Sequence, residues 1–407
     1  MKILQLCKKF PFPLKDGESI AVNQMSKALV EQGCELSLLA MNTSRHRYEL
    51  KQSIPQELNH YNYVYTVEVN NDIKTLDAFK NLFSKDSYHI SRFVSKQFEE
   101  KLIAILNKYT FDIIQLETLY LSPYLNIIKK HSDAMVVMRA HNIEHEIWDR
   151  ITHQIKFLPK KVYLNYLSKK LKNFEVEKLN GYDFLVAITD RDLNKFRELG
   201  YKNGCIASPV GFDLSKYQAD YSAYENKLAC CFIGSLDWIP NIEGLKWFFN
   251  QVWPLIHAKF PSLTFHFTGR NDTANLSEVK PEGTSYYPNI DHSVEFINQF
   301  PVMLVPLLSG SGIRVKILEG MALGKVVITT TIGLEGIPAI HKEEVFIADT
   351  PEEFLSVIQY MYKNPEVLLR MGQNARKFVE THFDSHKIAK DLVVAYKTAM
   401  HAHAVHE

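Results

Sequence analysis

A segment rich in glycine and serine, set between two apolar runs, offers the clearest chemistry in this sequence. Residues 305–328 are predicted to form a strand, a Gly/Ser loop, a helix and a second strand. Backbone N–H groups at a helix start lack intrahelical partners, and together with the helix dipole they favour an anion. The loop residues expected to approach a diphosphate or its sugar are Gly310, Ser311, Gly312 and Ile313.

Three charged side chains follow this loop at helical spacing. Arg314, at the start of the helix, is placed to add a charge-assisted hydrogen bond to a phosphate oxygen. Glu319, further along, would accept hydrogen bonds from paired hydroxyls such as those of a ribose. A plainer alternative stays open, in which Lys316 and Glu319 form an exposed i,i+3 ion pair worth about 0.2–0.5 kcal/mol.

A histidine segment forms a second candidate site. His141 follows the apolar run 135–139, where a histidine is either an acid–base group, since its pKa lies near neutrality, or a structural residue. His141, Glu144 and His145 also suggest a metal, but a further ligand at a recognisable spacing is missing. We therefore expect no metal site here.

Two further patterns have competing interpretations. Asp190 and Asp192 form a DxD pattern, which holds a divalent ion in some nucleotide-sugar enzymes, but their place at a helix start favours N-capping by Thr189 or Asp190. Gly17, at another expected helix start, is either a loop glycine or part of an anion site. The loop before it lacks GxGxxG, so a nicotinamide-dependent enzyme loses its main support.

Short apolar runs alternate with longer amphipathic stretches, which predicts βαβ units and parallel sheets covered by helices. In the first half, residues 18–32 have helical spacing and Gly33 is positioned as a C-cap. The strands expected there are 2–7, 35–40, 63–69, 113–117, 135–139 and 184–188. In the second half we expect a helix over 243–260 and the strands 228–233, 263–268, 302–307, 326–330 and 345–347.

The chain has 407 residues, more than the roughly 250–300 at which a single core stops growing. The fold class expected is therefore α/β, with two tandem doubly wound parallel-sheet domains facing a cleft. Residues 1–208 would form the first domain and 209–384 the second, joined near 205–227, where the sequence suits a linker. Residues 385–407 would form a terminal helix with a frayed tail.

Composition excludes several classes of protein. Hydrophobic residues make up 46% and charged residues 23%, as in ordinary globular chains. With 47 Lys and Arg against 46 Asp and Glu, there is no bulk electrostatic case for nucleic acid. Five cysteines without a CxxC support neither a disulfide framework nor a zinc knuckle, and favour a cytoplasmic protein. No run is long and apolar enough for a transmembrane helix, so any membrane contact would be peripheral.

Taken together, these segments resemble the GT-B-fold glycosyltransferases of the GT4 (group 1) type, which move a sugar from a nucleotide diphosphate with retention of configuration. The resemblance covers nearly the whole chain. The segments that carry it are the Gly17 loop, the His141 segment, residues 208–213, residues 232–238 and residues 309–324 with their Leu-Glu-Gly-Met-Ala.

The resemblance implies two Rossmann-like domains, of which the first binds the acceptor and the second binds the donor. It also implies that the terminal helix packs back on the first domain. Gly17 would lie beneath the donor phosphate, His141 would meet the donor sugar, and Glu319 would hold the ribose hydroxyls. Gly234 would line the donor site with the 310–313 loop. The family needs no catalytic metal and no cofactor besides its nucleotide-sugar substrate.

The chain also departs from the family pattern. The first Glu of the family's Glu-x7-Glu motif would fall at Ser311, which puts donor choice in question. The usual phosphate-binding Arg and Lys would fall near Ser235 and Asn241, neither of which is basic. We hypothesise that Arg314 and Lys316 replace that positive charge, with Arg270 as a second candidate.

The acceptor is predicted to be a glycan or lipid-linked glycan, in bacterial-type surface polysaccharide or glycoconjugate synthesis. A stretch with aromatic and aliphatic residues would suit an anionic membrane surface, although a solvated lysine face explains it equally well. Its lysines are Lys156, Lys160, Lys161, Lys169, Lys170 and Lys172. Two alternative functions stay open: a GT-B sugar-nucleotide epimerase, and a catalytically inactive GT-B module that binds a sugar or partner.

Overall fold

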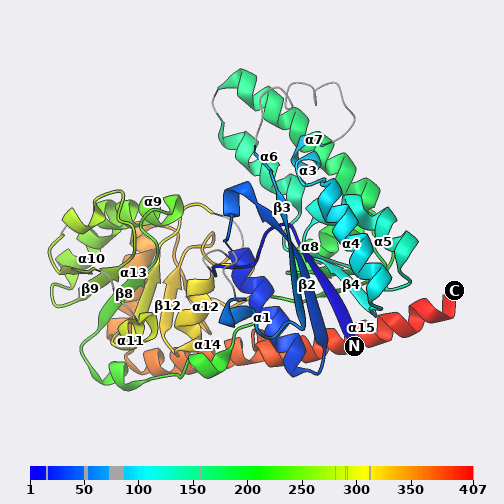
Figure 1. Ribbon diagram of the computed structural model, residues 1–407. Helices are drawn as coiled ribbons and strands as arrows, with labels where there is room; N and C mark the ends of the chain where they lie inside the picture. The colour runs from blue at the N-terminus through cyan, green and yellow to red at the C-terminus, as the bar shows by residue number, and fades with distance from the viewer. Residues whose placement is uncertain are drawn as a thin grey trace. The chain divides into compact units, whose positions relative to one another are not determined.

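The computed structural model describes residues 1–14, 17–49, 54–72, 87–155, 157–279, 281–288, 290, 292–310 and 313–406. The chain divides into two compact units. The first comprises Met1–Phe212 together with Ser385–Glu407, and the second comprises Asp213–Asp384. Each unit contains one parallel sheet, shown for both units in Figure 1.

The first sheet has seven strands in the order β3-β2-β1-β4-β5-β6-β7, all parallel. Its inner strands are almost entirely buried because helices cover both faces. The seven strands are β1 (Lys2–Cys7), β2 (Glu35–Thr43), β3 (Tyr63–Val69), β4 (Ile113–Leu116), β5 (Met135–Ala140), β6 (Phe184–Ala187) and β7 (Gly204–Ala207).

Helices cover both faces of this sheet, and Figure 1 shows α1 on one side with α4 and α5 on the other. They are α1 (Gly17–Glu31), α3 (Tyr88–Ser91), α4 (Lys96–Lys108), α5 (Leu125–His131), α6 (Glu144–Gln154), α7 (Leu158–Leu179), α8 (Asp190–Glu198) and α15 (Ser385–His406). Gly33 follows α1 with φ of +82°, a conformation that favours glycine, which confirms its expected C-capping position.

The terminal helix α15 belongs to the first unit although the whole second unit precedes it in sequence. Its residues Ile388, Leu392 and Tyr396 are buried in one core cluster with residues of β1, β2 and α1. The described part of the helix continues to His406.

The second sheet has six parallel strands in the order β10-β9-β8-β11-β12-β13. The strands are β8 (Ala229–Ile233), β9 (Thr264–Thr268), β10 (Thr284–Tyr287), β11 (Val302–Val305), β12 (Val326–Thr329) and β13 (Phe346–Ile347). The helices are α9 (Ile239–Trp247), α10 (Trp253–Lys259), α11 (Ser293–Asn298), α12 (Val315–Ala322), α13 (Pro351–Lys363) and α14 (Glu366–His382). A π-helical turn, Phe248–Val252, joins α9 to α10.

The structure corrects three details of the sequence prediction. Strand β7 overlaps the start of the segment 205–227 that is predicted to be a linker, because a short edge strand leaves only a weak apolar signal. Strand β10 was not predicted, for the same reason. The helix expected from residue 243 begins at Ile239, with Pro240 in its first turn, where a missing N–H costs nothing.

Candidate functional site

Each sheet has one point at which the strand order reverses, and ligands of open α/β sheets bind beyond the carboxyl ends of the strands at that point. In the second unit the chain runs outward from β8 to β10 and then returns to place β11 on the other side of β8. The reversal therefore lies between β8 and β11. In the first unit it lies between β1 and β4 by the same reasoning.

In the second unit, the loop after β8 is organised around Asn241. The Asn241 amide donates to the backbone carbonyl of Ser235 at 2.7 Å, and its Oδ1 accepts from Lys316 Nζ at 2.7 Å. Lys316 lies on α12, directly beside this loop. The two are so close that a Cβ added to Gly234 would clash with Lys316 Nζ. The glycine at 234 thus permits a close approach between the loop and an ammonium group.

The environment of Lys316 makes its charge adjustable. The side chain lies over the ring of Phe232, with Nζ 4.5 Å from the ring centroid. Burial lowers the pKa of Lys316 to about 7, with Glu319 opposing the shift and Arg314 adding to it. An amine of this kind gains its proton most readily when an anion binds nearby.

Glu319 and Lys316 form hydrogen bonds with different partners. The alternative prediction of an exposed ion pair between them is therefore wrong. Glu319 accepts a hydrogen bond from the hydroxyl of Tyr217 at 3.0 Å. Burial raises the pKa of Glu319, against the lowering effect of that hydrogen bond and of Lys316. Tyr217 was not predicted as a site residue, since it lies 102 positions away in sequence.

Arg314 precedes α12 and is buried, with 4% of its surface exposed. Its Nη2 lies 4.0 Å from a carboxylate oxygen of Glu335 and 3.5 Å from the backbone carbonyl of Ile332. A Cβ at Gly310 would come within 3.1 Å of the same nitrogen, and Gly310 has a φ of +124° that favours glycine. Ser311 and Gly312 lie outside the described residues, and Ile313 is partly buried beside them.

Two other predicted site residues lie at helix or strand ends. Gly17 is the first residue of α1 and is exposed, with open space where a Cβ would be. Arg270 is exposed in the turn after β9, and its backbone carbonyl accepts from the amide of Leu236 at 2.7 Å. That bond ties the turn after β9 to the loop after β8.

In the first unit, His141 is held by a carboxylate that the sequence analysis missed. His141 Nε2 lies 2.8 Å from Glu117 Oε2, and the same oxygen accepts from Arg139 Nη1 at 3.1 Å. Glu117 directly follows β4 and is fully buried. The one sequence signal was its place at the end of a buried strand, which a charged residue seldom occupies without a partner.

A wider polar network fixes this carboxylate. Gln115 donates to Glu117 Oε1 at 2.5 Å, Gln5 donates to the same oxygen, and Tyr396 of α15 donates to Gln115 Oε1 at 2.7 Å. Burial alone would raise the pKa of Glu117, but Arg139 and the His141 hydrogen bond outweigh it and lower the pKa to about 2. The carboxylate is therefore charged at any physiological pH.

A pocket opens beside His141 in the first unit, and its lining includes Thr118, Asn142, Glu144 and Glu175. Tyr120 donates a hydrogen bond to Glu144 at 3.0 Å, and burial raises the pKa of Glu144. The pocket therefore presents an imidazole, an amide and a buried carboxyl group within one small lined space.

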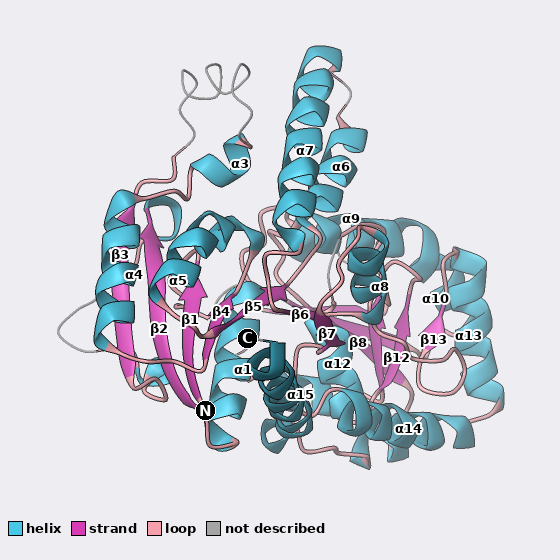
Figure 2. Cartoon of the chain, turned by 90° about the vertical axis from the view of Figure 1, so that its right-hand side faces the viewer, coloured by secondary structure: helices cyan, strands magenta, loops and turns pink. Residues whose placement is uncertain are grey.

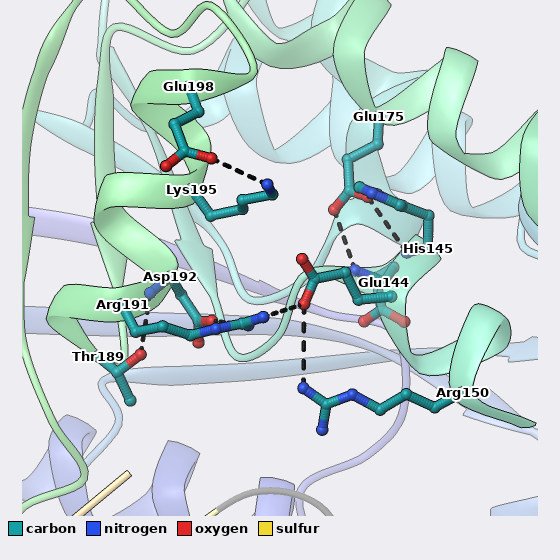
Figure 3. Close-up of polar contacts among 10 residues, drawn as sticks. Glu144, His145, Arg150, Glu175, Thr189, Arg191, Asp192, Lys195 and Glu198 are labelled. Atoms are coloured by element: carbon teal, nitrogen blue, oxygen red, sulfur yellow. Dashed lines mark hydrogen bonds and ion pairs between the residues drawn. The ribbon is translucent and has the colours of Figure 1, made fainter.

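Buried Glu175 of α7 caps the start of α6 (Figure 3). Its carboxylate accepts from the backbone N–H groups of Glu144 at 3.1 Å and His145 at 3.3 Å, and lies 2.6 Å from His145 Nδ1. The His145 side chain thus has a structural role in holding α6 against α7. Among the described residues, no group of three or more His, Cys, Asp or Glu side chains is arranged to hold a metal ion.

The DxD pattern lies in the first turn of α8, and Thr189 just before it is the N-cap, one of the two capping residues that the sequence favoured. The Thr189 side chain accepts from the amide of Asp192 at 3.1 Å at the start of α8, and Asp192 pairs with Arg191 at 2.8 Å (Figure 3). Within the described part of the chain, no helix combines the length and apolar character needed to cross a bilayer.

Comparison with known proteins connects this geometry to a family. Residues 227–364, which include β8, α12 and the loops around them, match the family model described as Glycosyl transferases group 1. An uncharacterised 44.6 kDa protein in the cps region of Klebsiella pneumoniae is 21% identical over 401 residues, covering 95% of this chain and 97% of that protein.

Solved structures show the same fold over nearly the full length. A sucrose-phosphate synthase from Thermosynechococcus elongatus superposes with a TM-score of 0.69 at 16% identity, covering 99% of this chain and all of that one. Anabaena Alr3699/HepE in complex with UDP gives 0.67 at 13% identity over 98% of this chain and all of its own. Alr3699/HepE has also been solved in complex with UDP-glucose. The expected α/β class with two parallel-sheet GT-B domains is confirmed.

Proposed function

We propose that this chain, a glycosyltransferase of the group 1 type with the GT-B fold, moves a sugar from a nucleotide diphosphate-sugar to a glycan or lipid-linked glycan with retention of configuration. The family match over residues 227–364 and a structural relative solved with UDP and with UDP-glucose support a nucleotide-sugar donor. The cps-region relative supports a role in surface polysaccharide or glycoconjugate synthesis.

The observation that carries the proposal is the position of Lys316. Its ammonium lies beside the Gly234 loop at the carboxyl end of β8, where the strand order of the second sheet reverses. The positive charge is supplied from α12, next to Asn241, which occupies a position that is basic in the family pattern. Lys316 would therefore neutralise the diphosphate of the donor, and Arg314 would support it from the Gly310 loop.

The remaining residues have roles that follow from their chemistry. Glu319, held by Tyr217, would accept hydrogen bonds from ribose hydroxyls. His141, oriented by Glu117, would face the donor sugar, and Gly17 would lie near the phosphate. Gly234, Arg270 and the 310–313 loop would line the donor site.

The reaction needs stabilisation of the charge that grows on the leaving diphosphate. As the anomeric C–O bond breaks, the electron pair stays with the diphosphate, and the acceptor oxygen attacks from the same face and passes its proton to an oxygen of the departing diphosphate. Fixed N–H dipoles and cationic side chains stabilise such charge without reorganising. We propose that these groups suffice without a metal ion and without any cofactor other than the donor, on the cytoplasmic side of the cell.

UDP binding to matched lysine variants tests the donor site. Lys316→Met removes the ammonium and retains most of the apolar stem, so the Kd for UDP should rise about 10- to 100-fold, the value of a charge-assisted hydrogen bond. Lys246→Met, on the exposed face of α9, makes the same chemical change outside the loop and should bind UDP like the wild type. Equal Kd values for both variants and the wild type would reject the assignment.

The variant Arg314→Ala distinguishes an effect on donor binding from an effect on acceptor binding. If Arg314 supports the diphosphate, its loss weakens nucleotide binding far more than acceptor binding; an equal loss of both would exclude this role. A thermal-shift comparison of UDP, GDP and ADP should precede it and identify the base.

An inactive binding module is the second candidate, and Ser311 in place of the family Glu favours it. An epimerase would need acid and base carboxylates around the sugar. Release of nucleotide from UDP- and GDP-sugars distinguishes the three. Acceptor-dependent release indicates transfer, sugar isomerisation without release indicates an epimerase, and binding without turnover indicates a module.

A further inference from the structure

We propose that the outward face of the α6–α7 hairpin docks on the surface of an anionic phospholipid membrane. The docking surface consists of Ile151, Phe157, Leu158, Val162 and Tyr166 with the lysines that flank them. The inference rests on the proposed function for its purpose, which is to bring a lipid-linked acceptor to the first unit. The docking itself is measurable without any sugar transfer.

The hairpin is rigid at its base and projects from the first unit, as Figure 2 shows. At the base, Glu175 of α7 caps α6, and Ser168 of α7 donates to Asp149 of α6 at 2.5 Å. The buried residues of α7 all lie from Leu167 onward. The first half of α7 therefore extends beyond the packed core, which places its side chains in a position to meet another surface.

The projecting half carries an apolar stripe on its exposed side. Leu158, Val162 and Tyr166 recur every four residues and so share one face of the helix. They are 69%, 62% and 40% exposed, and Phe157, just before the helix, is 67% exposed. Ile151 at the end of α6 adds a further exposed side chain. Several large apolar residues gathered at one projecting tip mark an interaction site rather than scattered surface hydrophobics.

The charge of this surface selects its partner. Between residues 158 and 172 the chain has no Asp or Glu and five lysines, namely Lys160, Lys161, Lys169, Lys170 and Lys172. Lys170 Nζ lies 4.8 Å from the centre of the Tyr166 ring, so the basic and apolar groups are interleaved. Lys156 lies outside the described residues. On α6, the acidic Glu146 is engaged by Arg191 at 2.5 Å.

A basic helix with an apolar stripe matches the boundary between anionic headgroups and acyl chains. The lysines are attracted by the negative surface potential, at about 1 kcal/mol each, while the apolar side chains enter the interface. A second copy of this chain fits less well, because two such surfaces would bring their lysines together and the like charges would repel. Lipid is the partner that satisfies both features of the surface.

Vesicle flotation with the full chain tests the proposal. Wild type should bind vesicles containing phosphatidylserine or phosphatidylglycerol, bind neutral phosphatidylcholine vesicles weakly, and release as salt rises, since charge attraction is screened. Lys169→Gln with Lys172→Gln should weaken binding about 30-fold, the equivalent of about 2 kcal/mol. Leu158→Ser with Val162→Ser should weaken it at least tenfold without changing the charge.

Controls separate the surface from general effects. Lys377→Gln with Lys390→Gln, at exposed positions on α14 and α15, removes the same net charge and should bind vesicles like the wild type. The four substituted residues of the docking surface are exposed, so thermal unfolding should be unchanged in all variants. Equal binding of wild type and tip variants would overturn the proposal. So would concentration-dependent self-association that the tip variants abolish in the absence of vesicle binding.

Failure of the docking and failure of the proposed function are distinguishable. UDP binding and turnover with a soluble acceptor, both measured without vesicles, should be the same in the wild type and the tip variants. Binding to anionic vesicles through this surface without any sugar transfer would support the docking proposal and contradict the proposed enzyme function.

Discussion

At the scale of single residues, the proposed donor site depends most on Lys316. The resemblance to group 1 glycosyltransferases implies a basic residue near position 241 in the loop after β8, whereas this chain has Asn241 there. Lys316 reaches the same loop from α12, and its amine lies 2.7 Å from Asn241 Oδ1. Burial lowers the pKa of this amine to about 7, which makes its charge sensitive to pH in the physiological range.

UDP binding should weaken as pH rises from 7 to 9. The bound diphosphate raises the pKa of Lys316, so the protonated form binds more tightly and binding takes up a proton above pH 7. With a pKa of about 7 in the free protein, Kd should rise by up to about tenfold per pH unit. Isothermal titration across this range measures the slope. The Kd of Lys316→Met should not change with pH, and the Kd of Lys246→Met should change with pH as it does in the wild type. A flat wild type would contradict the assignment.

Glu117 is expected to position His141 and to stabilise the first unit. Replacement of Glu117 by Gln leaves Arg139 as an unbalanced buried charge, which should cost about 3–5 kcal/mol of unfolding free energy. Because its pKa is lowered to about 2 from an unfolded value of about 4.3, the carboxylate contributes stability above about pH 4.5. That contribution is lost as pH falls toward 2.

Urea denaturation at several pH values measures the effect. In the variant, the part of the acid sensitivity between about pH 4.5 and 2 that belongs to this carboxylate should disappear. His141→Ala is the matched comparison, since it should reduce transfer strongly while it changes stability less than Glu117→Gln. A stable Glu117→Gln protein with wild-type acid sensitivity would show that the buried network has been misread.

At the scale of elements, α15 links the end of the chain to the buried network beneath His141. Tyr396 donates to Gln115, and Gln115 donates to Glu117. The helix also buries Leu392 completely in the cluster it shares with α1 and the first sheet. The terminal helix is therefore part of the framework that positions a candidate site residue.

Truncation of a buried side chain on α15 should destabilise the first unit. Leu392→Ala removes a fully buried side chain and should cost about 2–5 kcal/mol. Val394→Ala, 57% exposed on the same helix, should change stability by no more than about 0.5 kcal/mol. Chemical denaturation of both variants provides the measurement, and similar losses in the two would show that α15 is not packed as described.

At the scale of the whole molecule, the two units have separate cores, and we propose that the second one binds the donor. The apolar clusters of the first unit consist of residues from Met1–Phe212 and α15. The main cluster of the second unit consists of residues from Asp213–Asp384. A nucleotide that binds the second unit should therefore stabilise that unit directly.

Hydrogen exchange with and without UDP tests this division. At 100 times its Kd, UDP stabilises the unit that binds it by about 2.7 kcal/mol. Peptides spanning β8 to α9 and α12 to β12 should show slower exchange. Peptides from β2 and β3, on the far side of the first sheet from β5, serve as the internal control and should change least. Protection confined to the first unit would relocate the donor site.

Local patterns were sufficient to predict most of the fold. Strands such as β1 and β3 and the helix α1 follow from apolar spacing and a glycine cap, because these signals depend on neighbours within one turn or one pleat. The Gly/Ser loop with Arg314, Lys316 and Glu319 was found in the same way. Strands β7 and β10 could not be predicted, because four residues at a sheet edge carry too little apolar periodicity.

Only the tertiary structure decided which side chains meet. Lys316 and Asn241 are 75 positions apart, and Tyr217 and Glu319 are 102 apart. Glu117 and His141 meet because β4 and β5 are adjacent and parallel, which brings their carboxyl ends together. No periodicity within one segment encodes such a pairing, since it depends on the order in which distant strands assemble.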